Sequence, residues 1–124
     1  MTTRITTQNI TDATITTTDL ASSVPLNTQW QAVKTATFTA VAGEGYFINT
    51  SAAVRTMTLP AGTLGDEISF VDYAGTFDTN ALTVAPNGSE KIQGTAASLT
   101  VSVERAANTL VYVDGTQGWL LKNK

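Results

Sequence analysis

The chain has 124 residues, enough for one domain of ordinary size, and it combines a low charged fraction of 14% with 24 threonines and a formal net charge of −3. The 7 basic residues are spread along the whole chain, which disfavours the concentrated positive surface that nucleic-acid binding needs. Cysteine and histidine are absent, so disulfides, thiolate sites and histidine-based metal or acid–base sites are excluded. No apolar stretch is long enough for a membrane span, and residues 1–20 lack the apolar core of a signal peptide.

Residues 1–27 carry large aliphatic side chains every five residues, at Ile5, Ile10, Ile15 and Leu20. A five-residue step collects side chains neither on one face of a helix nor on one face of a strand. The spacing suits an extended arm whose aliphatic residues meet those of two further copies at a shared axis. We therefore predict a homotrimer in which this arm serves trimer formation or capsid docking. A disordered polar arm, and an arm that orders only on a partner, remain open alternatives.

Residues 28–124 are expected to form one all-β domain. The composition changes at "SSVPLNT", where Pro25 removes a backbone donor, and no helical pattern longer than a turn follows. The segments expected to form strands are, in chain order, "VKTATFTAV", "YFIN", "VRTMTL", "DEISFVDY", "ALTV", "KIQ", "SLTVSV", "TLVYV" and "GWLL". "KIQ" is expected to return as a hairpin after the turn "PNGS". Short strands separated by turns predict an antiparallel sandwich or barrel-like domain, and the lack of crossover helices argues against parallel pairing.

Few residues are suited to catalysis or metal binding. No histidine is present to activate a serine, and no G-x-S-x-G sequence occurs. Asp66, Glu67, Asp72 and Asp78 could supply a glycosidase pair, but acidic residues that flank a surface strand explain them better. The loop "DYAGTFDTN" offers oxygen ligands for calcium at Asp72, Asp78 and Asn80, yet it lacks the spacing of an EF-hand, and these residues also form turns. We expect no enzymatic activity, no cofactor and no metal.

Aromatic side chains offer the remaining candidate site. Most aromatic residues of a small all-β domain belong to its core, so an exposed platform is the exception. Tyr73 and Phe77 flank the loop at Gly75 and are the candidates for a glycan-facing loop.

Several stretches after Trp30 resemble a known domain. They are "GYFINTS", "TMTLPAG", "GDEISFVDYAGTFDTNALTVAPNGSEKIQG" and "LVYVDGTQGWLL", of which "DYAGTF" and the final "GW" are the most specific. These stretches are similar to a β-rich domain of bacteriophage structural proteins, particularly of cyanophages and other marine phages, found in tail fibres and capsid-associated proteins. The "NITDATIT" of the arm resembles the threonine and isoleucine ladders by which trimeric fibre proteins join the particle. The resemblance implies a homotrimeric virion protein without enzymatic activity.

The short length of the segment before the domain favours one virion role over another. A tail fibre with this domain at its tip is expected to carry a long shaft, whereas only residues 1–27 precede the domain here. We therefore expect a capsid decoration (cement) protein on the outer capsid surface, which binds the major capsid protein, bridges capsomers and stabilises the head. The alternative is a tail-fibre or spike-tip adhesin that binds host surface glycans. A third class, a bacterial β-domain with an accessory role in transport or catalysis, would go with a monomeric chain.

Overall fold

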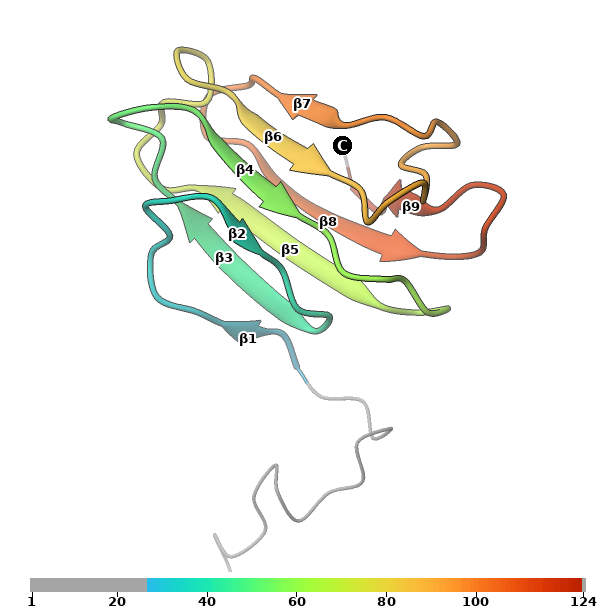
Figure 1. Cartoon of the computed structure of the whole chain (residues 1–124). Coiled ribbons are helices and arrows are strands. Elements are labelled where there is room, and N and C mark those ends of the chain that lie inside the picture. The colour runs from blue at the N-terminus through green and yellow to red at the C-terminus, as the bar shows by residue number, and fades with distance from the viewer. Residues whose placement is uncertain (1–26, 124) are drawn as a thin grey trace, which may run out of the picture.

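The computed structural model describes residues 27–123, which form two β-sheets packed face to face in a sandwich that does not close into a barrel (Figure 1). The five-stranded sheet has the order β1 (Gln29–Trp30), β3 (Glu44–Ile48), β5 (Glu67–Asp72), β8 (Ala107–Tyr112) and β9 (Trp119–Leu121). The four-stranded sheet has the order β2 (Phe38–Thr39), β4 (Arg55–Thr58), β6 (Leu82–Ala85) and β7 (Leu99–Val101). No helix occurs in residues 27–123, and so none that could cross a membrane. The all-β prediction is confirmed.

The first six strands alternate between the two sheets. Strands β1, β3 and β5 lie in the five-stranded sheet, and strands β2, β4 and β6 lie in the four-stranded sheet. After each strand of one sheet, a strand of the facing sheet returns the chain to the starting end, and the next strand of the first sheet begins there. Strands two apart in the sequence consequently pair in parallel, in β1–β3, β3–β5, β2–β4 and β4–β6. Only the later pairs, β5–β8, β6–β7 and β8–β9, are antiparallel.

The prediction of an antiparallel domain is therefore wrong, because both sheets are mixed. It assumed that only a helix could return the chain between parallel strands, but here a strand of the facing sheet does so. The predicted hairpin at "KIQ" is also wrong, because β6 pairs with β7 and Ile92 forms single bridges to Thr95 and Trp119.

The predicted trimer is not tested by this single chain. The aliphatic residues of the predicted arm, Ile5, Ile10, Ile15 and Leu20, lie outside the described residues.

The inward-facing side chains of both sheets form one apolar core. Alternation along each strand places every second residue in the core, as for Tyr46 and Ile48 of β3 and for Ile68 and Phe70 of β5. Trp119 of β9 is the largest of the fully buried side chains. The other large core residues are Met57, Leu59, Phe77, Leu82, Val84 and Leu110.

The outer faces of the two sheets differ in chemistry. On the four-stranded sheet the register sets Thr56 beside Thr83, and Thr83 beside Thr100, so that the outward side chains of three strands form a row of hydroxyls. On the five-stranded sheet the outer face carries the aromatic residues Trp30 and Phe47 at one side. This second face also carries a recess, which is described next.

Candidate functional site

Trp30 covers the outer face of the five-stranded sheet at its edge. Its register partner on β3 is Gly45, and a Cβ atom at Gly45 would lie 2.6 Å from Cε3 of Trp30. The indole also stacks on Phe47, with ring centroids 4.9 Å apart and an interplanar angle of 28°. Trp30 nevertheless stays 47% exposed. The sheet edge therefore presents a large aromatic surface whose position is fixed by two neighbours.

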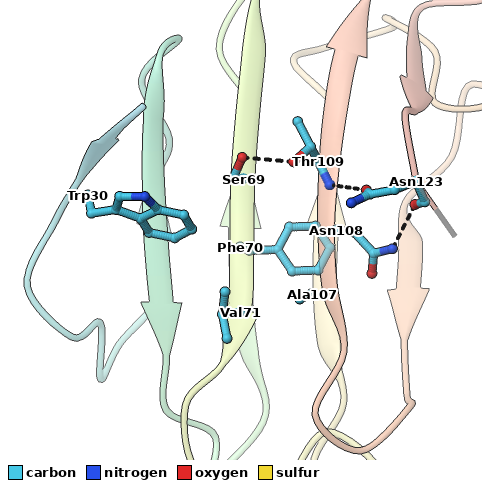
Figure 2. Close-up of a pocket in the computed structure, with 8 residues that line it drawn as sticks. All are labelled: Trp30, Ser69, Phe70, Val71, Ala107, Asn108, Thr109 and Asn123. Atoms are coloured by element: carbon cyan, nitrogen blue, oxygen red, sulfur yellow. Dashed lines mark hydrogen bonds between the residues drawn. The ribbon is translucent and has the colours of Figure 1, made fainter. Parts of the chain in front are cut away.

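Beside Trp30 the outer face forms an open hollow of about 210 Å³ over β5 and β8. Figure 2 shows Trp30 on one side and Asn123 on the other, with small side chains such as Ser69 and Ala107 between them. The lining consists of Trp30, Ser69, Phe70, Val71, Ala107, Asn108, Thr109 and Asn123. None of these eight residues is charged.

Hydrogen bonds hold the polar side chains of the hollow (Figure 2). The hydroxyls of Ser69 and Thr109 lie 2.9 Å apart and share one hydrogen bond. The backbone N–H of Thr109 donates to Oδ1 of Asn123 at 2.7 Å, and Nδ2 of Asn108 donates to the carbonyl oxygen of Asn123 at 2.8 Å. These contacts orient both amides. Asn108 pairs in register with the buried Phe70, so its side chain lies on the core-facing side of the sheet, whereas the hydroxyls of Ser69 and Thr109 lie on the outer face with the hollow.

The stretch "DYAGTF" forms a turn built on the buried carboxylate of Asp72, which is 1% exposed. Oδ1 accepts the backbone N–H groups of Gly75 and Thr76 at 3.0 and 3.1 Å, and Oδ2 accepts those of Phe77 and Arg105 at 3.1 and 2.9 Å. Burial alone would raise the pKa of Asp72, but the four backbone donors outweigh it, and the pKa lies below 3.8. The carboxylate thus joins the loop after β5 to the turn before β8 as a structural element.

The two residues predicted for a glycan-facing loop are separated by this turn. Phe77 is fully buried in the core, so its ring cannot face a glycan, and the prediction is corrected for this residue. Tyr73 is 50% exposed, and its role stays a prediction. Within residues 27–123, no three acidic side chains come together in a group that could hold a metal ion.

Trp30 is an exposed aromatic residue that the sequence did not single out. The pattern around it gives no strand signal as strong as those of the core strands, and β1 has only two residues. The signal that could have identified it is the pairing of a large aromatic residue with Gly45, but this pairing depends on a register that is not encoded locally.

The fold and its internally hydrogen-bonded loops define an all-β sandwich domain. The chain belongs to the family described as bacteriophage T4 gp9/10-like protein, N-terminal, whose model matches residues 3–117. It is also similar to the baseplate wedge protein gp10 of Enterobacteria phage T4, with 32% identity over 91 residues. That match covers 71% of this chain but only 15% of the relative, so the chain spans a small part of the relative's length. The expectation of a phage structural protein is thereby confirmed.

Proposed function

We propose that the chain is a structural component of the tail end of a phage particle, where it joins further copies of itself to neighbouring tail proteins. The observation that carries this proposal is the similarity to the baseplate wedge protein gp10 together with the family match over residues 3–117. In this proposal the copies form a homotrimer through the N-terminal arm. The chain has no enzymatic role and requires no cofactor.

One end of the sandwich supports an assembly role. Strands β1, β3 and β5 are parallel, and β8 is antiparallel to β5. The segments that follow β1, β3 and β5 and the turn before β8 therefore lie at the same end of the sandwich. Each of these four segments carries an exposed apolar side chain. They are Val33 at 38%, Val54 at 61%, Tyr73 at 50% and Val103 at 67% exposure. Exposed apolar side chains at the same end of the sandwich favour contact with a partner protein.

The capsid decoration role expected from the sequence has weaker support. It rested on the short segment before the domain, whereas the similar protein is named a baseplate component. In the tail proposal, a neighbouring tail protein takes the place of the major capsid protein as the partner. The second candidate is an adhesin at the tip of a fibre or spike, which the exposed rings of Trp30 and Tyr73 favour.

Immunogold electron microscopy tests the location. Antibodies raised against residues 28–123 are applied to purified particles of a phage that encodes the chain, and antibody against the major capsid protein marks the head as a control. We expect gold at the tail end. Gold distributed over the head would overturn the proposal and favour a decoration protein. If the antibody does not label intact particles, mass spectrometry of tails separated from heads decides the location.

A further inference from the structure

We propose that the hollow beside Trp30 is a binding site for an uncharged sugar ring. The inference rests on an exposed aromatic ring on one side, the Asn123 amide and a hydroxyl pair on the other, and a lining without charge. It goes beyond attachment to the particle and does not depend on whether the chain belongs to the tail or the head.

The aromatic side of the hollow suits the apolar face of a pyranose. Trp30 is 47% exposed, so its indole offers uncovered apolar surface that a sugar ring would remove from water. The indole ring stacks on Phe47 and lies directly over Gly45, so its position is already fixed. Stacking a ligand on it therefore costs little side-chain entropy. An exposed but fixed aromatic side chain is therefore available as a platform.

The polar side suits sugar hydroxyls, which both donate and accept hydrogen bonds. The hydroxyls of Ser69 and Thr109 both donate and accept, and the amide of Asn123, which the backbone N–H of Thr109 already orients, supplies a further donor. This hydroxyl pair lies between Asn123 and Trp30. A sugar ring stacked on Trp30 can direct its hydroxyl groups toward these polar side chains.

The absence of charge selects the ligand class. A phosphate, a nucleotide or an acidic sugar would need a cationic side chain in the hollow, and none of the lining residues has one. Lys122, next to Asn123, already pairs with Glu67 at 3.3 Å. The hollow is also open and polar on one side, which disfavours a purely apolar ligand.

The test is a titration of the full chain, labelled with ¹⁵N, with the methyl glycosides of glucose, galactose, mannose and N-acetylglucosamine. The chain has two tryptophans, and so two indole N–H signals. We expect at least one glycoside to shift the Trp30 signal saturably, with a dissociation constant on the order of 1 mM. The Trp119 signal should stay in place, because Trp119 is fully buried. A Trp30 signal that no glycoside moves at about tenfold higher concentration would overturn the proposal.

Variants locate the site, with binding measured by saturation transfer to the glycoside. We expect Trp30→Ala to weaken binding about tenfold, and Asn123→Ala to weaken it severalfold. Tyr73→Ala removes an equally exposed aromatic side chain from the loop end of the sandwich and should leave binding unchanged. Unchanged binding in both Trp30→Ala and Asn123→Ala, or loss of binding in Tyr73→Ala alone, would contradict the site. The buried Trp119 signal reports whether each variant folds. If Trp30→Ala does not fold, the result for Asn123→Ala decides whether the hollow is the binding site.

Discussion

Gly118 illustrates how a single residue is fixed by the backbone beside it. It adopts a φ of +75°, and a Cβ atom there would overlap the carbonyl group of Lys91. The same carbonyl accepts the backbone N–H of Trp119 at 2.9 Å, so this contact holds β9 against the preceding chain. Only glycine therefore fits before Trp119, because any side chain at position 118 would collide with the backbone of Lys91.

We expect Gly118→Ala to lower the free energy of unfolding by about 3 kcal/mol or more, because it combines backbone strain with a clash against main-chain atoms. Urea denaturation followed by tryptophan fluorescence measures the change. Gly115→Ala is the matched control, since nothing lies within 4 Å of a Cβ atom at that position. The control should change stability by less than about 0.5 kcal/mol. Equal effects of the two substitutions would rule out the contact with Lys91 as the cause.

Asp72 makes the stability of the domain depend on pH. Its native pKa lies below 3.8, the value for the unfolded chain, so the ionised carboxylate stabilises the fold above that pH. This contribution is lost as the pH falls through the native pKa. Asp72→Asn should cost about 3 kcal/mol near pH 7, because an amide cannot accept all four N–H groups.

Urea denaturation of wild type and variant at several pH values checks this prediction. The difference between them should shrink as the pH falls below 3.8. Asp78→Asn serves as the control because Asp78 is exposed, and it should change stability by less than about 0.5 kcal/mol. A difference that stays constant down to about pH 2 would show that the carboxylate's charge is not what stabilises the turn.

At the scale of elements, β4 is an interior strand of the four-stranded sheet whose register fixes which of its side chains enter the core. It lies between β2 and β6 and pairs in parallel with both. Met57 is fully buried, while its neighbours Thr56 and Thr58 are partly exposed. A shift of one residue would therefore exchange a core side chain for a hydroxyl.

Inserting one alanine between Thr56 and Met57 should destabilise the domain by about 4 kcal/mol or more, because Met57 leaves the core and a polar residue enters it. The same insertion between Ala52 and Ala53, in an exposed loop, should cost about 1 kcal/mol or less. Thermal unfolding of both variants gives the comparison. Similar midpoints for the two would contradict the register.

Strand positions followed from local sequence more closely than strand pairing did. The alternation in "VRTMTL", "DEISFVDY" and "TLVYV" predicted β4, β5 and β8, because a half-buried strand needs a period of two. The long pattern "VKTATFTAV" instead yields only the two-residue strand β2 and a single bridge at Lys34. Its alternation was not enough, since a strand also needs a partner along its whole length.

At the scale of the whole molecule, the predicted trimer depends on the arm, which lies outside the described residues. Replacing Ile10 and Ile15 by aspartate should reduce the chain to a monomer with a folded sandwich, because two charges would enter the shared apolar axis. Light scattering gives the mass, and circular dichroism gives the fold. The control replaces Thr7 and Thr17 by aspartate, which adds the same charge and keeps the aliphatic residues. A monomeric wild-type chain at micromolar concentration would contradict the trimer.

The sequence by itself determined the all-β class, most strand positions and the lack of histidine- or cysteine-based chemistry, because these depend on composition and on short-range periodicity. It did not determine that the first six strands alternate between sheets, that Phe77 is buried beside an exposed Tyr73, or that Trp30 lies over Gly45 beside a hollow. Those features depend on contacts between residues far apart in the chain. The tertiary structure decided them because pairing and register are set by the shared core of both sheets.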